Sequence, residues 1–254
     1  MQERIEFRNS RGQKLAGKMS VPHGKGPFPA LVFAHGRGSG KNAKKAVELS
    51  KRLGDGFVCF SFDFSGCYES EGKFEDTTIT DEINDLKTAI ELVRKMPFVK
   101  EVHIVGSSLG GLVALLYAAK YNKLKSLVLH CPAFDFRQTY SDKNGKYGLR
   151  EWRGKGYTVV ETSWGEDRIK YDFYKDGLKY DTIKETGKIS CPTLLVHGDQ
   201  DENVPVEQSK RLFDCLKCEK RLEIVNGADH RFSREPDFEK LMVLTIKWLN
   251  EHSI

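Results

Sequence analysis

The chain has 254 residues, of which 39% are hydrophobic and 30% are charged. This balance is typical of a folded globular protein and excludes a disordered or fibrous class, and the length suits one α/β domain over residues 1–254. The net charge of +5 comes from 41 basic and 36 acidic residues spread along the chain, which is typical of a solvated surface and argues against a nucleic-acid partner.

The N-terminal segment "MQERIEFRNSRGQKLAGKMSVP" predicts a β-hairpin, because two alternating runs flank turn residues at positions 9–12. It has no apolar stretch of the signal-peptide kind. No later segment reaches the roughly 18 apolar residues that a membrane span requires. We therefore expect a cytoplasmic protein that has no membrane partner.

The next strand pattern ends in "VFAHGRGSGK", whose residues 35–40 we call the glycine-rich loop. A nucleotide-binding P-loop here would need a glycine at position 35 and a hydroxyl at position 42, where the chain has His35 and Asn42. The dinucleotide fingerprint fails at its last glycine, which is replaced by Lys41. The loop is therefore not predicted to bind phosphate.

Strand and helix patterns alternate along the rest of the chain. Short apolar runs predict parallel strands at residues 30–36, 57–64, 102–108, 126–132, 193–199 and 221–227. Helical periodicity appears at residues 44–54, 78–96, 109–121, 206–218 and 238–252. This alternation predicts an open, mostly parallel sheet with helices on both faces, and ligands bind beyond the carboxyl ends of such strands.

The segment at residues 132–190 interrupts this alternation, and we call it the lid. It is rich in aromatic, charged and glycine residues and has no clear strand pattern, which favours a folded insertion. Its aromatic residues suggest a partly apolar acyl or aryl pocket. Trp152, Tyr157 and Trp164 are therefore candidate substrate-binding residues.

The six cysteines fit a reducing compartment. Cys59, Cys131 and Cys191 lie in or beside apolar runs, where free cysteine behaves as a small hydrophobic residue. Cys215 and Cys218 form a C-x-x-C without a second ligand pair, in a segment with helical periodicity. We interpret these two as thiols on one helix face.

The segment "VGSSLGG" contains a G-x-S-x-G between a predicted strand and a predicted helix. Such a turn is tight enough to require small residues around the serine, and it holds the hydroxyl out above the sheet edge. This predicts Ser108 as a nucleophile. Ser107 is not at the centre of the pattern, and we interpret it as packing or hydrogen-bonding support.

A serine nucleophile needs a base that is oriented by a carboxylate, and after a G-x-S-x-G the partners follow in the order acid, then histidine. His230 lies in a loop after a strand and after the candidate acids. Asp201 lies deeper in "HGDQDENVP" than Asp199, which suits a turn-stabilising role, and Glu202 is a third carboxylate within reach. Asp229 is too close in the chain to reach round the imidazole easily. We choose Asp201 as the acid and His230 as the base.

Attack on a carbonyl carbon creates an oxyanion, which needs two backbone N–H donors. Leu109, the residue after the nucleophile, supplies one. The glycine-rich loop supplies the other, for which we choose the N–H of Arg37.

Taken together, "HGRGSGKN", "FDFSGCYESEGKFED", "VGSSLGG", "HGDQDENVP" and "GADHRFS" resemble the α/β-hydrolase superfamily. Within it the chain is similar to the cinnamoyl or feruloyl esterase-like carboxylesterases, which are related to serine aminopeptidase-like hydrolases. The resemblance covers nearly the whole chain and implies that Asp201 is the triad acid and that a lid follows "SLVLHCP". The chain departs from the family at Gly66-Cys67-Tyr68, where Gly-x-Gly is common, and this departure concerns the pocket wall.

The sequence thus predicts a serine carboxylesterase that hydrolyses a small-molecule ester through an acyl-enzyme and needs no metal or other cofactor. A peptidase or a thioesterase with the same triad is the alternative within enzymes. A non-catalytic binding module is the alternative outside them. The sequence does not decide between a monomer and a homodimer.

Overall fold

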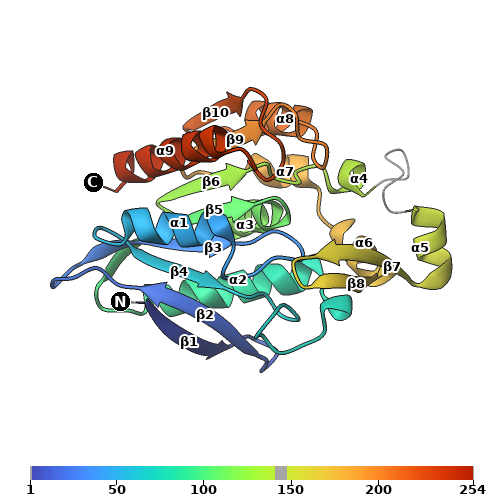
Figure 1. The fold of residues 1–254 in the computed structure, drawn as a ribbon, viewed down its shortest axis with the longest axis horizontal. Helices are drawn as coiled ribbons and strands as arrows, with labels where there is room; N and C mark the ends of the chain where they lie inside the picture. The colour runs from blue at the N-terminus through green and yellow to red at the C-terminus, as the bar shows by residue number, and fades with distance from the viewer. Residues whose placement is uncertain (1, 141–147, 254) are drawn as a thin grey trace.

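The computed structural model describes residues 2–140 and 148–253. Its centre is an eight-stranded sheet in the order β1-β2-β4-β3-β5-β6-β9-β10 (Figure 1). The strands are β1 (Gln2–Arg8), β2 (Lys14–Ser20), β3 (Phe28–Ala34), β4 (Val58–Phe62), β5 (Val99–Ser107), β6 (Ser126–His130), β9 (Thr193–Gly198) and β10 (Lys220–Val225).

Six neighbouring strands of this sheet, from β4 to β10, run parallel. The hairpin of β1 and β2 adds to β4 in the antiparallel direction. Every residue of β6 and β9 is buried, as the apolar runs predict for strands covered on both faces. The predicted α/β fold with an N-terminal antiparallel hairpin is confirmed.

Two layers of helices cover the sheet (Figure 1). α1 (Lys44–Leu53) and α9 (Glu235–Glu251) pack on one face. α2 (Ile79–Arg94), α3 (Leu109–Tyr121) and α8 (Glu207–Cys215) pack on the other, and a short 3-10 helix, η1 (Phe74–Asp76), precedes α2. Each face has its own hydrophobic cluster, so the two helix layers hold the strand ends in fixed positions.

The end of α8 differs from the prediction. The helix stops at Cys215, and Cys218 lies beyond it, in the connection to β10. The Cys218 thiol contacts Thr193 Oγ1 at 3.7 Å. The two cysteines therefore do not share a helix face.

The described part of the lid between β6 and β9 contains four short helices and a β-hairpin. The helices are α4 (Phe136–Thr139), α5 (Leu149–Lys155), α6 (Tyr171–Gly177) and α7 (Thr182–Thr186). The hairpin pairs β7 (Tyr157–Thr162) with β8 (Gly165–Lys170), and it lies beyond one end of the main sheet (Figure 1). Residues 141–147 of the predicted lid lie outside the described residues.

The hairpin corrects the expectation that the lid has no strand. Each of its strands buries one residue, Val160 in β7 and Ile169 in β8. The sequence therefore has no apolar run at this place, and backbone pairing holds the two strands together.

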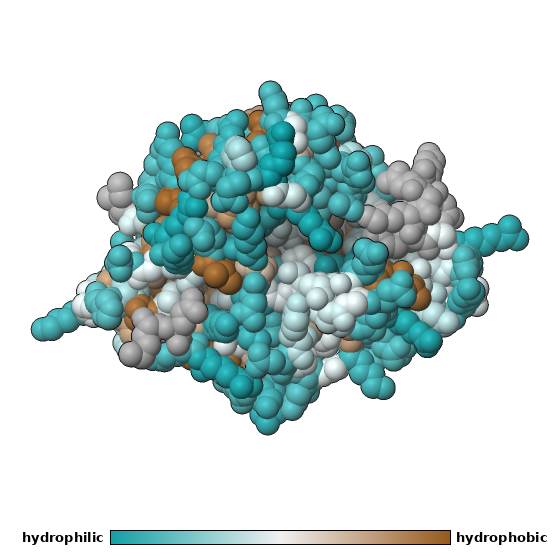
Figure 2. Space-filling model, viewed as in Figure 1, coloured by the Kyte–Doolittle hydropathy of each residue, from teal (hydrophilic) through white to brown (hydrophobic). Residues whose placement is uncertain are grey.

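Hydrophilic residues predominate on the face shown in Figure 2, and hydrophobic residues appear in small separate groups. Within residues 2–140 and 148–253, no helix has the length and hydropathy needed to cross a bilayer.

Candidate active site

The predicted nucleophile lies in the sharp turn between β5 and α3. Ser108 has φ 55° and ψ −118°, a conformation that a non-glycine residue rarely adopts. A Cβ atom on Gly106 would lie 2.6 Å from a backbone oxygen of α3, and one on Gly110 would lie 2.3 Å from the backbone oxygens of Ala34 and His35 at the end of β3. The turn therefore needs both glycines, as the pattern predicts.

Ser108, His230 and Asp201 come from three different loops and form one hydrogen-bonded chain. His230 Nε2 lies 3.0 Å from Ser108 Oγ. His230 Nδ1 lies 2.6 Å from Asp201 Oδ2. An ionised carboxylate only accepts hydrogen bonds, so the ring proton belongs on Nδ1, and Nε2 is left to accept from the serine hydroxyl. The structure thus brings together all three residues that the sequence selects.

The carboxylate of Asp201 is buried and fully hydrogen-bonded. Its Oδ1 accepts the N–H groups of Asn203 and Val204, each at 2.8 Å. Its Oδ2 lies 3.1 Å from His197 Nε2. Burial alone would raise the pKa of Asp201, but the hydrogen bonds from His197 and His230 hold that pKa below its ordinary value. Asp201 is therefore ionised and orients His230.

His197 is a residue of this network that the sequence patterns do not single out. It is the last but one residue of β9, and its Nδ1 lies 2.6 Å from Ser209 Oγ. A histidine at a strand end, four residues before the acid, is the signal that could have indicated this contact.

The other candidate carboxylates have different partners. Asp199 accepts the N–H of Gly227 at 2.6 Å and so joins two neighbouring loops. Asp229 accepts the N–H groups of Arg231 and Ser233 at 3.1 and 2.9 Å and so stabilises its own turn. Glu202 is exposed.

The glycine-rich loop passes directly over the nucleophile. A Cβ atom on Gly36 would lie 3.3 Å from Ser108 Cβ and 3.9 Å from Ser108 Oγ. Arg37 follows Gly36 in the chain and lines the same cleft as Ser108. Leu109 is the first residue of α3, and the first amides of a helix have no partner within the helix. Both predicted oxyanion donors therefore border the nucleophile.

The start of the glycine-rich loop is anchored by a buried histidine. His35 Nδ1 lies 2.8 Å from the carbonyl oxygen of Gly36, and the N–H of Phe64 donates to His35 Nε2 at 3.1 Å. Burial lowers the pKa of His35, which favours the neutral ring that can donate on one side and accept on the other.

A cleft of about 950 Å³ opens over Ser108 and His230, large enough for an organic substrate. Its apolar wall includes Tyr68, Leu109, Tyr140, Val159, Val160 and Phe238. The charged side chains among its described lining residues are Arg37, Lys44, Lys45, Arg231 and Glu161. The departure at Tyr68 thus falls on the pocket wall, as the sequence indicates.

The three predicted lid aromatics are not among the described residues that line this cleft. Trp152 is 1% exposed, packs on Tyr171 and Tyr174, and donates its Nε1–H to Ile169 O at 3.0 Å. Tyr157 contacts the guanidinium of Arg168. Trp164 packs edge-on against Tyr68 and Phe74. These three aromatic side chains thus contribute to packing within and around the lid, and other lid residues line the cleft.

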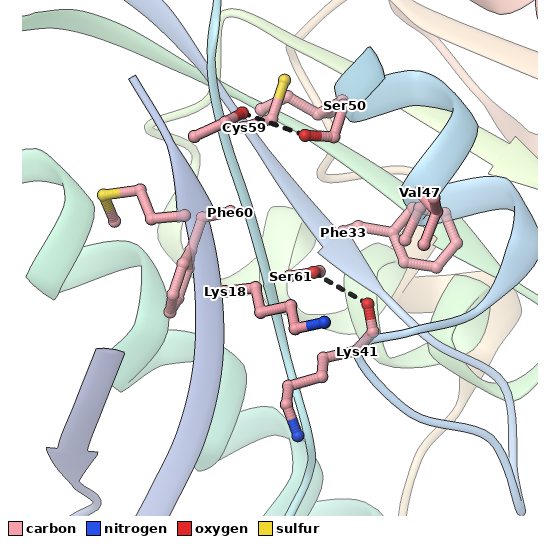
Figure 3. A pocket seen from close by; sticks show the side chains of 12 residues that line it. Lys18, Phe33, Lys41, Val47, Ser50, Cys59, Phe60 and Ser61 are labelled. Carbon is pink, nitrogen blue, oxygen red and sulfur yellow. Dashed lines mark hydrogen bonds between the residues drawn. The ribbon is translucent and has the colours of Figure 1, made fainter. Parts of the chain in front are cut away.

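A second, small cavity of about 30 Å³ lies between β2, β3, β4 and α1 (Figure 3). It has room for a water molecule but not for an organic substrate. Two pairs of its polar groups are hydrogen-bonded, since Ser61 donates to the carbonyl of Lys41 at 2.9 Å and Ser20 pairs with Ser50 at 2.9 Å.

Three potential metal ligands, Cys131, Asp201 and His230, lie within 4.8 Å of one another. Burial raises the pKa of the Cys131 thiol, which disfavours the thiolate that a metal would need. The Nδ1 of His230 is already held by Asp201. This arrangement favours hydrogen bonding over metal binding.

The model of the prolyl oligopeptidase family matches residues 46–253, a range that contains Ser108, Asp201 and His230. The chain belongs to the prolyl oligopeptidase family. Among its relatives, palmitoyl-protein thioesterase ABHD10, mitochondrial, of Homo sapiens is 29% identical over 230 residues, covering 87% of this chain and 73% of the relative. The uncharacterized peptidase YtmA of Bacillus subtilis is 26% identical over 211 residues, covering 82% and 77%.

Solved structures show the same fold for this member of the family. Est1E from Butyrivibrio proteoclasticus, solved with ferulic acid bound, superposes with a TM-score of 0.86 at 23% identity, covering 98% of both chains. The mouse α/β hydrolase domain-containing protein 10 superposes with a TM-score of 0.79 at 25% identity, covering 99% of this chain and 100% of that one. The α/β-hydrolase resemblance is confirmed, and the chain is a serine hydrolase of this type.

Proposed function

We propose that the protein is a serine carboxylesterase that hydrolyses small-molecule carboxylic esters through an acyl-enzyme. The observation that carries this proposal is the hydrogen-bonded chain Ser108–His230–Asp201 at the floor of the cleft. Catalysis by these three side chains requires only protein groups and water, so the proposal includes no metal or other cofactor.

In the first half of the reaction, Ser108 Oγ attacks the ester carbonyl carbon while His230 Nε2 takes the hydroxyl proton. The amides of Arg37 and Leu109 stabilise the oxyanion, and Asp201 stabilises the imidazolium. Collapse of the tetrahedral intermediate breaks the bond to the alcohol, which leaves with the proton from His230. Water then attacks the acyl-enzyme by the same route and releases the acid and free Ser108.

The charges of the cleft favour an ester over the substrate of an aminopeptidase. An aminopeptidase must bind a substrate ammonium group, which carboxylates recognise. Among the described lining residues, four are basic, and Glu161 is the acidic one. A cationic amine would therefore meet a repulsive field close to Ser108.

A thioesterase is the second candidate, because the relatives include a palmitoyl-protein thioesterase. Esters and thioesters share the acyl half of the reaction. The apolar wall with Tyr140, Val159 and Val160 suits an acyl or aryl group of either substrate. Esters and thioesters differ in the leaving group, since a thiol depends less than an alcohol on a proton from the acid form of His230.

Turnover of matched substrates tests the proposal. We expect p-nitrophenyl esters to have a higher kcat/KM than acyl thioesters and aminoacyl anilides. Ser108→Ala should lower kcat by about 10³-fold or more, and the matched control Ser107→Ala by less than about tenfold. Faster cleavage of anilides would favour the peptidase. Ester turnover that survives in Ser108→Ala would contradict the proposed triad, and absence of any turnover would favour the non-catalytic binding module.

The cytoplasmic location, the absence of a nucleic-acid partner and the open choice between monomer and homodimer stay as predictions from the sequence.

A further inference from the structure

The tip of the lid hairpin, residues 162–165, binds the glycine-rich loop. The N–H and the hydroxyl of Ser163 both donate to the carbonyl oxygen of Gly38, at 2.8 and 2.7 Å. A Cβ atom on Gly38 would lie 2.9 Å from Thr162 Cα, so the two backbones are in direct contact. The lid and the loop over the nucleophile therefore form one packed unit.

Tyr68 provides a second connection between the same two segments. Its hydroxyl donates to Ser163 Oγ at 2.6 Å, and its ring meets the ring of Trp164 edge-on, with the centroids 4.9 Å apart. On the other side, its ring leaves no room for a Cβ atom on Gly40, which would lie only 2.4 Å away. Tyr68 is thus wedged between the lid hairpin and the glycine-rich loop.

The backbone of Tyr68 is held in an unfavourable conformation. Its φ of 44° lies in the left-handed region, which disfavours bulky residues. The residue is also 53% exposed, so burial of its ring does not explain this strain. Strained residues persist where surrounding contacts over-determine them, and they concentrate at functional sites.

The Gly38 carbonyl that Ser163 binds belongs to the same turn as the Arg37 amide. The N–H of Ser39 donates to the carbonyl oxygen of Gly36 at 3.2 Å, which closes a turn with Arg37 and Gly38 at its two central positions. Gly38 has φ 64°, the positive value that the third residue of a type II turn requires. Because Ser163 fixes the carbonyl of Gly38, it also limits rotation of the peptide group next to it.

We propose that Ser163 and Tyr68 are positioning residues that hold the turn at residues 36–39 so that the Arg37 N–H faces the oxyanion. Packing of the lid hairpin against the glycine-rich loop then completes the oxyanion hole. This inference rests on the proposed function. It predicts that weakening the contact lowers the rate of the chemical step and leaves binding of a small substrate unchanged, because a misplaced oxyanion donor acts only in the transition state.

The test measures kcat and KM for p-nitrophenyl acetate, together with the rate of inactivation by a serine-reactive phosphonate. Ser163→Ala should lower kcat and the inactivation rate about tenfold, with KM within about twofold of the parent. Tyr68→Phe, which keeps the ring, should lower kcat about threefold. The double variant should match Ser163→Ala, because the Tyr68 hydroxyl acts through Ser163. The control is Glu166→Gln, an exposed position on the same hairpin, which should leave kcat unchanged.

The inference is overturned if Ser163→Ala keeps kcat within about twofold of the parent, if it acts only through KM, or if Glu166→Gln causes an equal loss. Ser108→Ala in the same assay separates this result from failure of the proposed function. Turnover that survives in Ser108→Ala refutes the esterase proposal, whereas the ratio of kcat between Ser163→Ala and the parent decides the role of the lid contact.

Discussion

The hydroxyl of Ser108 needs His230 as its base, and His230 is oriented by the carboxylate of Asp201, which is ionised although it is buried. The charge of Asp201 is stabilised by two backbone N–H groups and by two histidine rings. Replacing one carboxylate oxygen by an amide nitrogen would remove an acceptor from this network and would release the imidazole from the tautomer that accepts the serine proton.

We therefore predict that Asp201→Asn lowers kcat for a p-nitrophenyl ester by about 10³- to 10⁴-fold. The matched control is Asp199→Asn, two residues away in the same loop. Asp199 accepts a hydrogen bond from the N–H of Gly227 and does not contact His230, so kcat of this variant should fall by less than about tenfold. Steady-state kinetics of the two purified variants check the prediction, and equal losses in both would contradict the assignment of the acid.

The sequence could predict the three triad residues because each follows a recognisable pattern at the carboxyl end of a strand. Parallel strands bring these ends to one edge of the sheet, so chain order and position were enough. The sequence places His197 at a strand end, four residues before the acid, but it does not give the direction of the ring, which depends on packing against Ser209 and Val204. Trp152 was misplaced because composition does not tell whether an aromatic side chain faces a cleft or the lid core.

The elements were predicted unevenly, for a physical reason. Helix α2 buries one continuous face, and helix α3 buries nearly all its residues. Their predicted ranges therefore lie within a few residues of the observed ones. The β7–β8 hairpin has one buried residue in each strand and gives no periodic signal. It exists because its backbone groups pair and its tip binds the glycine-rich loop.

Helix α2 carries a buried acid in its first turn. Glu82 is 6% exposed, and burial, reinforced by Asp85 and opposed by Arg37, raises its pKa to about 8. The ordinary pKa is 4.5. Below pH 4.5 both the folded and the unfolded chain keep this proton. As the pH rises toward 8 the unfolded chain loses it while the folded chain keeps it, so stability is lost over this range.

Glu82→Gln should therefore stabilise the fold at high pH, on the order of 3 kcal/mol near pH 8, and by much less near pH 5. Urea unfolding at the two pH values measures the difference. The exposed Glu91 on the same helix offers the control, and Glu91→Gln should change the free energy of unfolding by less than about 0.5 kcal/mol at either pH. A gain for Glu82→Gln that does not depend on pH would contradict the protonated state of this acid.

At the scale of the whole molecule, the net charge is +5, and the cleft has an excess of basic groups as well. Its described lining carries four basic side chains and one acidic one. Lys45 on α1 lies beside the turn of the nucleophile, with its Nζ 3.2 Å from Ser107 Oγ. Burial lowers the pKa of Lys45, so its ammonium group gains from a nearby anion.

We expect an ester with an anionic acyl end to be preferred over a neutral ester of the same length. The kcat/KM of p-nitrophenyl hemiglutarate should exceed that of p-nitrophenyl valerate by about fivefold at low salt, and the advantage should shrink near about 0.5 M salt. Lys45→Met should remove most of the advantage, and Lys51→Met, at an exposed position of α1, should keep it. Preference for valerate at every salt concentration would contradict this prediction.

Covalent labelling tests the central claim most directly. The intact protein is treated with a serine-reactive phosphonate, digested, and mapped by mass spectrometry, with Ser108→Ala as the control. The account predicts a single phosphonyl adduct on Ser108, loss of esterase activity in proportion to labelling, and no adduct on Ser108→Ala. An adduct on Ser107 or on any other residue, or a labelled protein that still hydrolyses esters, would contradict it.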